Sequence, residues 1–135
     1  MRVVIDANVL VSAYAHRGTI HQQWREGLGP HEYVISPEIF QEVERNLRQS
    51  EFLLSESQVR EALVDILNRC RLERSPTEFE GDIPHENDRH LASLYLACAA
   101  EYVVTGETVL RRGSNGGVKF ISISEFIRDV DHSQL

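Results

Sequence analysis

Apolar residues recur along the chain at two alternating spacings, one typical of buried strands and the other of helices. Val3-Val4-Ile5 is a short β-branched run, as in a buried strand. The apolar residues between Ile39 and Leu47, in contrast, recur at helical spacing. We predict strands at about residues 2–6, 33–35, 71–73, 102–105 and 118–121, and helices that begin at about residues 8, 37 and 55 or cover about residues 21–26, 88–100 and 124–130.

Polar residues mark the beginnings of several predicted helices. Ser36-Pro37 combines a favoured N-cap residue with the residue favoured at the first helical position. Ser55 with Gln58, and Ser122 with Glu125, match the capping box, in which two side chains each accept a hydrogen bond from the other residue's backbone N–H. These signals predict where the helices start more sharply than apolar spacing alone.

Strands that alternate with helices predict one domain, residues 1–135, with a three-layer α/β/α fold around a mostly parallel central sheet. The segment 75–87 is acidic and contains two prolines, so we predict an irregular loop there. The segment 111–117 contains three glycines, and we predict that it is flexible.

The chain is acidic, with 14 Lys and Arg against 21 Asp and Glu and a formal net charge of −7. This charge argues against tight nonspecific binding to duplex nucleic acid and suits a basic protein partner. Cys70 and Cys98 lack metal-ligand spacing, so we expect reduced, buried thiols in a cytoplasmic protein. No apolar run is long enough to span a membrane, and we expect no signal segment.

The first predicted strand ends on a carboxylate, Asp6. Burying an ionised carboxylate is costly unless a cation lies beside it, and open α/β sheets bind ligands where their strands end. Asp6 therefore indicates a metal or phosphate site. The alternative is that Asp6 or Asn8 caps the following helix, which is a common role for both residue types.

Three more acidic residues are expected near Asp6. Glu107 follows the strand at 102–105, Glu42 lies in the helix after the strand at 33–35, and Asp88 opens the helix at 88–100. Each has a simpler interpretation, as a loop-surface, helix-surface or helix-capping residue. Together they predict a site for Mg²⁺ or Mn²⁺, because crowded carboxylates repel one another without cations and hard ions prefer oxygen ligands. Such a site fits two-ion phosphodiester hydrolysis.

The spans that contain these acids resemble the successive motifs of PIN-domain proteins in order and spacing. The resemblance covers nearly the whole chain and is closest to prokaryotic PIN proteins described as toxins of toxin–antitoxin pairs. It implies a Mg²⁺- or Mn²⁺-dependent endoribonuclease that cuts single-stranded RNA and is held in check by an antitoxin. The spans are residues 4–11 (VIDANVLV), 36–43 (SPEIFQEV), 87–92 (NDRHLA) and 102–107 (YVVTGE).

Carried over by position, the resemblance implies that Asp6, Glu42 and Asp88 are the core catalytic and metal-binding acids and that Glu107 is the fourth. Glu86, just before Asp88, remains open as a further ligand. Glu107 stands where the family usually has Asp. A longer side chain displaces the carboxylate, and a misplacement of roughly 1 Å can cost two orders of magnitude in rate.

The resemblance also implies supporting polar residues. Asn8 and Thr105 stand where the family has side chains that support the metal or its water. Ala7 replaces a common threonine, which removes a hydroxyl but no charge.

Arg89, Arg111 and Arg112 are the candidates for contacts to RNA phosphates. Arg89 directly follows Asp88, and the other two precede the glycine-containing segment. For Arg111 and Arg112, a solvated surface position explains the sequence equally well. Among the histidines, we expect His90 alone to line the site.

A different functional class remains open: a catalytically weakened PIN-fold module that binds metal or a partner without turnover, which the change at Glu107 favours. A response-regulator phosphoacceptor or an Asp6-based phosphatase fits less well, because both require another acid close after Asp6, where the chain has Ala7 and Asn8. A duplex-cutting nuclease would need more basic surface. The apolar helices are compatible with a homodimer.

Overall fold

The computed structural model describes residues 1–112 and 116–131, and within them five strands form one sheet. The strand order is β3-β2-β1-β4-β5, so β1 lies at the centre. Every described strand pair is parallel, which confirms the predicted parallel sheet. The strands are β1 (Arg2–Ile5), β2 (Glu32–Ile35), β3 (Cys70–Leu72), β4 (Tyr102–Val104) and β5 (Phe120–Ile121).

Helical segments connect these strands. No helix within the described ranges is both long and apolar enough to cross a membrane. The α-helices are α1 (Ala7–Ala15), α2 (Thr19–Gln22), α3 (Pro37–Leu47), α4 (Glu56–Arg69), α5 (Arg89–Ala97), α6 (Thr108–Arg112) and α7 (Ile123–Glu125). The 3-10 and π segments are η1 (Gln23–Gly27), η2 (Ser50–Phe52), η3 (Glu86–Asp88) and η4 (Phe126–Asp131).

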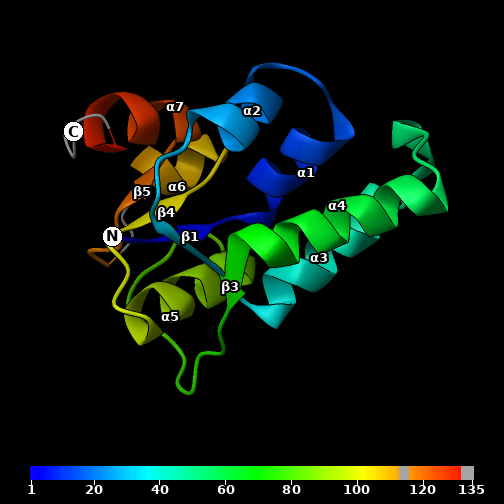
Figure 1. Ribbon diagram of the computed structural model, residues 1–135. Coiled ribbons are helices and arrows are strands. Elements are labelled where there is room, and N and C mark those ends of the chain that lie inside the picture. Colours follow the sequence, from blue (N-terminus) through cyan, green and yellow to red (C-terminus); the bar gives the residue numbers. More distant parts are fainter. Residues whose placement is uncertain (113–115, 132–135) are drawn as a thin grey trace.

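Helices cover both faces of the sheet, as Figure 1 shows: α1 and α2 lie on one side of β1, and α5 lies on the other. α1 packs against α3, α3 packs against α4, and α5 packs against β1 and β4. Right-handed crossovers explain this arrangement, because the chain moves one way across the sheet from β1 to β3 and the opposite way from β3 to β4. The predicted three-layer α/β/α fold is confirmed.

The central strands are apolar on both faces because helices cover both faces. Val3, Val4, Val34 and Val103 are each 0% exposed. Phe126, in η4, is also 0% exposed and belongs to the same hydrophobic core. The C-terminal helical segment therefore packs with the rest of the chain.

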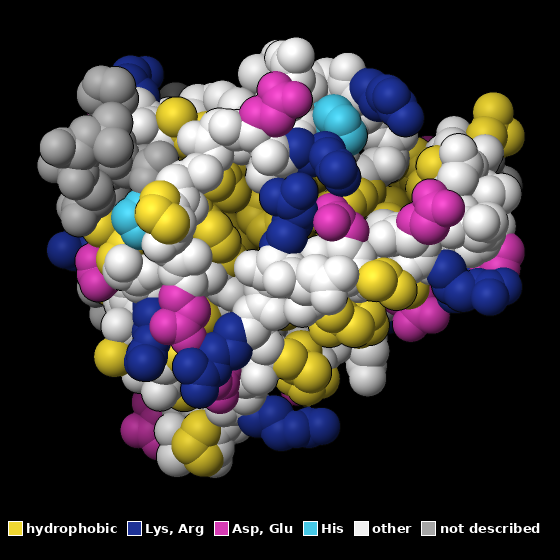
Figure 2. Space-filling model, viewed as in Figure 1, with side chains coloured by type: hydrophobic (Ala, Val, Ile, Leu, Met, Phe, Trp, Pro, Cys, Tyr) yellow, Lys and Arg dark blue, Asp and Glu magenta, His cyan; other side chains and the backbone are white. Residues whose placement is uncertain are grey.

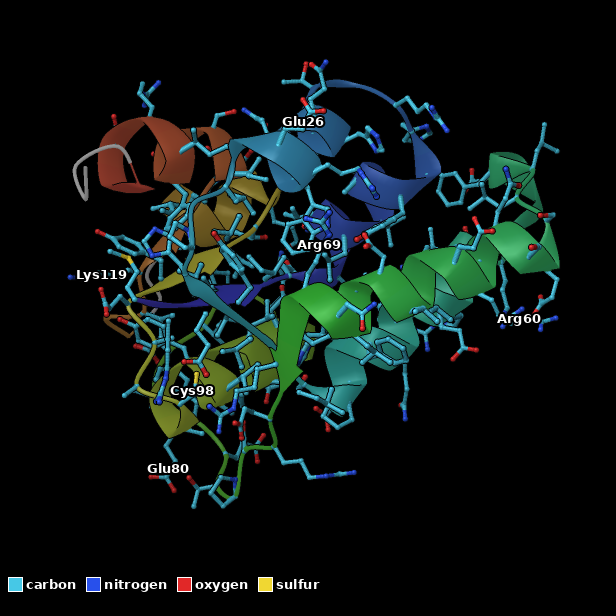
Figure 3. The ribbon with its side chains drawn as sticks, viewed as in Figure 1. Glu26, Arg60, Arg69, Glu80, Cys98 and Lys119 are labelled. Atoms are coloured by element: carbon cyan, nitrogen blue, oxygen red, sulfur yellow. The ribbon has the colours of Figure 1, made fainter. Side chains whose placement is uncertain are left out.

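Polar side chains tie α1 and η1 to α4. The Asp65 carboxylate accepts hydrogen bonds from Tyr14 Oη, from Arg69 Nε at 3.0 Å and from Arg25 Nη1 at 3.3 Å. Trp24 Nε1 donates to Tyr14 Oη at 2.8 Å. Arg69 and Arg60, labelled in Figure 3, mark α4, whose last turn joins this network. The network fixes the positions of the helices on this face.

The predicted helix starts are confirmed. Ser36 Oγ accepts from Ile39 N at 3.2 Å, with Pro37 in the first turn. Ser55 and Gln58 form the expected capping box. Ser122 and Glu125 form another at α7.

The helix predicted over residues 88–100 is shorter, because α5 ends at Ala97. Ala99 adopts a left-handed conformation with φ 54°, and Ala100 N donates to Tyr95 O at 2.9 Å. This pattern is that of a Schellman-type helix end, in which glycine is usual. The prediction ran too far because the sequence offers no glycine at this position.

The segment after β4 also differs from the prediction. We expected flexibility over 111–117, but Arg111 lies in α6, which Leu110 anchors by complete burial. Residues 113–115 of that segment lie outside the described residues. The last strand is β5, shorter than the predicted 118–121. The two cysteines, Cys70 and Cys98, are free and buried, as expected; Cys98 is labelled in Figure 3.

Candidate functional site

Asp6 lies at the carboxyl end of β1, where the sheet register brings it beside β4. Ile5 is paired with Val104, so the residues that follow, Asp6 and Thr105, lie side by side. Asp6 N donates to Val104 O at 2.9 Å and continues the ladder by one bond. The Asp6 side chain is only 5% exposed, although no cationic side chain bonds it in the described chain.

Thr105 is the hydrogen-bonding centre of this edge and is 0% exposed. Its hydroxyl donates to Asp6 Oδ2 at 2.7 Å. Its oxygen accepts from Glu107 N at 3.1 Å and from Asn8 Nδ2 at 3.5 Å. With one proton given and both lone pairs engaged, the hydroxyl has a single orientation, which points its proton at Asp6.

Asn8 joins the first turn of α1 to the loop after β4. Its Oδ1 accepts from Gly106 N at 3.1 Å, while its Nδ2 donates to Thr105. The alternative in which Asp6 caps α1 is wrong, because Asp6 occupies the N-cap position but its side chain makes no capping bond. Asn8 lies inside the helix and bonds away from it, so it is not the cap either.

The other acids come from three separate elements. Asp88 occupies the N-cap position of α5 and likewise makes no capping hydrogen bond. The carboxyl groups of Asp88 and Glu107 lie within hydrogen-bonding reach, with Glu107 as the donor when it is protonated. Glu42, on α3, acts electrostatically on both Asp6 and Asp88. The structure therefore brings the three other predicted acids within electrostatic range of Asp6.

Burial and mutual repulsion favour the neutral forms of these acids. The pKa of Asp6 is raised from 3.8 to about 7, chiefly by burial; the Thr105 hydroxyl lowers it, and the charges of the three other acids add to the increase. Burial also raises the pKa values of Asp88 and Glu107. Such shifts mark a site that is electrostatically unsatisfied without a cation.

The donor set fits Mg²⁺ or Mn²⁺, which favour carboxylate oxygens. Within the described ranges, however, no three His, Cys, Asp or Glu side chains are arranged as the ligands of one ion. Carboxylates that surround one point without a cation would repel one another, and Asp88 instead lies within hydrogen-bonding reach of Glu107. The acids therefore suit a divalent ion by their chemistry and their location. To bind one ion together, some of their side chains must adopt other rotamers.

Two histidines lie beside the acids. His85 is close enough for its charge to lower the pKa values of Asp88 and Glu107. We did not predict His85, and its position in an irregular loop gave no periodic signal that could have indicated it. His90 was expected here, and its buried Nδ1 has no hydrogen-bond partner in the structure. Burial lowers the pKa of His90.

Arg89 binds the acidic loop rather than facing solvent. Its Nη1 donates to Phe79 O at 2.7 Å and to Gly81 O at 2.9 Å, and its other nitrogens bond the Glu86 carboxylate at 2.7 and 3.0 Å. Phosphate binding by Arg89 remains a prediction that would require these bonds to break. Glu86 is paired with Arg89, which leaves it little suited to the ligand role that the sequence left open.

The two remaining arginine candidates follow β4. Arg111 Nη1 donates to Glu125 Oε1 at 3.2 Å, which joins α6 to α7. The side chain of Arg112 lies outside the described residues. Contacts of either with RNA remain predictions.

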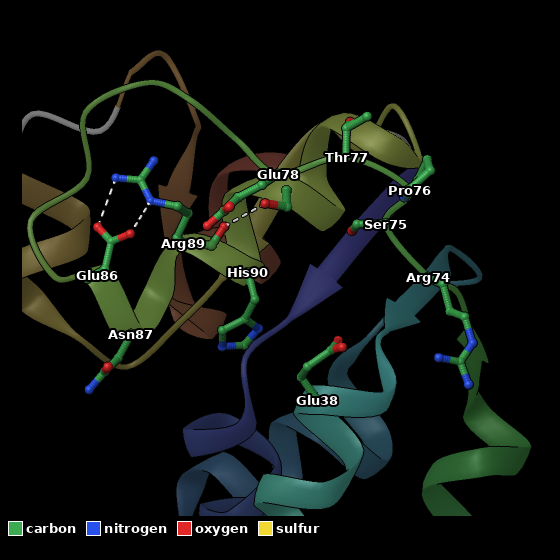
Figure 4. A pocket seen from close by; sticks show the side chains of 11 residues that line it. Glu38, Arg74, Ser75, Pro76, Thr77, Glu78, Glu86, Asn87, Arg89 and His90 are labelled. Carbon is green, nitrogen blue, oxygen red and sulfur yellow. Dashed lines mark hydrogen bonds and ion pairs between the residues drawn. The ribbon is translucent and has the colours of Figure 1, made fainter.

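A groove of about 450 Å³ lies next to the acids, between the start of α3, the start of α5 and the loop after β3 (Figure 4). Glu38 and His90 line this groove, and the charge of Glu38 acts on His90. Glu42 acts on His90 as well, so His90 stands between this groove and the acidic cluster. The other lining residues are Arg74, Ser75, Pro76, Thr77, Glu78, Glu86, Asn87, Arg89 and Ser93.

Comparison with known proteins bears on this site. A family model described as PIN domain matches residues 2–108, a span that includes all four acids. A search of curated proteins found no match.

Proposed function

The chain belongs to the PIN-domain family, whose domains are generally of nuclease type, and we propose that it is a metal-dependent endoribonuclease that hydrolyses phosphodiester bonds in single-stranded RNA. The observation that supports this most strongly is Asp6, a buried carboxylate with no capping role and three acidic neighbours. A fold does not normally keep such a group without a ligand that needs its charge.

In this proposal Asp6, Glu42, Asp88 and Glu107 hold Mg²⁺ or Mn²⁺. The bound metal would supply an activated water and stabilise the charge that develops on the phosphate oxygens. Asp6 gains its orientation from the Thr105 hydroxyl, which bonds Oδ2 and leaves Oδ1 without a hydrogen bond from the described side chains. The remaining acids come from α3, α5 and the loop after β4, so their positions depend on the packed sheet rather than on one local segment.

The substrate proposal rests on the surface charge. On the face of the molecule that Figure 2 draws, Lys and Arg side chains lie beside Asp and Glu, without a broad basic surface. The net charge of −7 points the same way. Duplex nucleic acid would require an extended basic surface, whereas a single strand needs only a few contacts close to the site.

We also propose that the protein is the toxin of a toxin–antitoxin pair and acts in the cytoplasm as a single domain over residues 1–135. The acidic charge suits a basic antitoxin segment. The two buried free cysteines suit a reducing compartment. Val64 and Leu67, both exposed on α4, give a homodimer one apolar surface to use.

A second candidate function is a module that binds metal or a partner without turnover. This function is favoured by the proximity of Glu107 and Asp88. The longer Glu107 side chain can hydrogen-bond the Asp88 carboxylate, which is then not free to bind a metal. Glu107→Asp shortens this side chain. An increase in cleavage rate in that variant would identify Glu107 as the cause of weakened activity.

The direct test is incubation of the protein with an unstructured mixed-sequence RNA, with Mn²⁺, with Mg²⁺ or with EDTA. DNA of the same sequence serves as the matched substrate control. We expect cleavage of the RNA only when a divalent ion is present. A folded protein that cleaves neither substrate with either ion would leave the binding module as the better function.

A further inference from the structure

The groove beside the acids is lined by two residues with hydrogen-bond acceptors that no donor in the described chain satisfies. Glu38 points into the groove opposite His90, as Figure 4 shows. In the described part of the chain, Glu38 makes no hydrogen bond and no ion pair with Arg or Lys. His90 adds a buried Nδ1 without a partner. A volume of about 450 Å³ is that of a small-molecule site.

The position of Glu38 in the sequence places it at the start of α3. It lies in the first turn of that helix, directly after Pro37, and its charge is favoured there by the helix dipole. Glu42 follows one turn later on the same helix. A group bound by Glu38 would therefore lie next to the acidic cluster and not at a remote surface.

We propose that this groove binds a guanine base of the RNA, next to the phosphodiester that is cut; the inference rests on the proposed function. Guanine presents two adjacent N–H donors on its Watson–Crick edge, and one carboxylate accepts both. Adenine and cytosine place a ring acceptor beside their amino group, and uracil places carbonyls on both sides of its N–H. Each of these would set a lone pair against a carboxylate oxygen.

His90 and Arg74 complete the groove. His90 makes no hydrogen bond in the described chain, and because its Nδ1 is buried, its Nε2 is the nitrogen that can donate to guanine O6, next to the N–H groups that Glu38 receives. Arg74 lies at the edge of the groove and makes no hydrogen bond or ion pair in the described chain. Its guanidinium is free to contact a phosphate, which favours binding of every nucleotide without distinguishing bases.

Titration of the metal-free, isotope-labelled protein with GMP, AMP, CMP and UMP tests this inference by NMR. We expect GMP to bind about tenfold more tightly than the other three, with shifts in the His90 ring signals. Glu38→Gln should remove this preference, because its amide NH2 meets the donors of guanine. Arg74→Ala should weaken the binding of all four nucleotides alike. Glu61→Gln, an exposed control on α4, should leave the four affinities unchanged.

Equal binding of the four nucleotides to the wild-type protein would overturn the inference, as would an unchanged guanine preference in Glu38→Gln. Binding of an arginine-rich peptide in the groove, without nucleotide binding, would overturn it in favour of a basic protein ligand. The titration needs neither metal nor cleavage. Guanine binding by a protein that cleaves no RNA would reject only the proposed function, and RNA cleavage without base preference would reject only the guanine site.

Discussion

Asp6 is held in surroundings that favour its neutral form, although the proposed function needs its charge. Burial is the main reason that its pKa is raised to about 7, and within the described residues its side chain accepts one hydrogen bond, from the Thr105 hydroxyl. A carboxylate at this position does not serve stability, because burying an apolar or amide side chain there would cost less free energy. The conflict is resolved when a cation binds beside Asp6.

Asp6→Asn should make the metal-free protein more stable at pH 8, by about 1–3 kcal/mol, while abolishing metal-dependent cleavage. Because the folded pKa of Asp6 lies above its ordinary value of 3.8, the stability linked to this group is complete below that value and is lost as the pH rises through about 7. Thermal unfolding in EDTA at pH 5 and pH 8 measures the effect. A variant less stable than wild type at both pH values would contradict it.

Thr105 should act through its hydroxyl, since three groups bond it. Thr105→Val leaves Asp6 and Asn8 without that partner, and we expect it to lower stability by about 1–3 kcal/mol and to weaken Mn²⁺ binding. Thr105→Ser keeps the hydroxyl and serves as the matched control. Calorimetric Mn²⁺ titrations of both variants compare them, and equal affinities would show that the hydroxyl does not position the site.

At the scale of elements, the sequence predicted helix starts better than helix ends. Ser36, Ser55 and Ser122 have local side-chain partners that the sequence displays, and each caps its helix as expected. The end of α5 depends on Ala99, an unusual residue for a left-handed position, and α6 depends on the buried side chain of Leu110. The local sequence shows neither feature, because no glycine marks the left-handed turn at Ala99 and the burial of Leu110 depends on tertiary packing.

Ala99→Gly should stabilise the protein by about 0.5–1 kcal/mol, because glycine adopts the left-handed conformation without steric cost. Ala99 is exposed and has φ 54°, so the substitution removes strain and little packing. Ala97→Gly, within α5, is the control and should destabilise by a similar amount. Urea unfolding of the two variants separates them, and destabilisation by both would contradict the assignment of strain to Ala99.

At the scale of the whole molecule, the order of strands and acids predicted that Asp6, Glu42, Asp88 and Glu107 would lie at one edge of the sheet. In the structure the other three act on the charge of Asp6, so their proximity to it could be predicted from topology alone. The sequence could not show that Arg89 bonds the acidic loop, nor that His85 lies beside Asp88. Both depend on the path of the loop at 75–87, which has no periodic pattern.

Metal binding should couple to pH through Asp6. Because the folded carboxyl titrates near 7, Mn²⁺ must displace its proton below that pH. We expect Mn²⁺ affinity to rise about tenfold between pH 6 and pH 8, with about one proton released per ion at pH 6. Titration calorimetry in two buffers of different ionisation enthalpy counts the protons. An affinity that does not change with pH would mean that Asp6 is not a ligand.

The most direct test of the account is Mn²⁺-dependent cleavage of single-stranded RNA by wild type, Asp88→Asn and Asp82→Asn. Asp88 belongs to the acidic cluster, whereas Asp82 is an exposed acid in the neighbouring loop and undergoes the same chemical change. The account predicts that Asp88→Asn folds and loses cleavage by at least about two orders of magnitude, while Asp82→Asn retains it. Equal cleavage by a folded Asp88→Asn and wild type would contradict the proposal that this cluster is the active site.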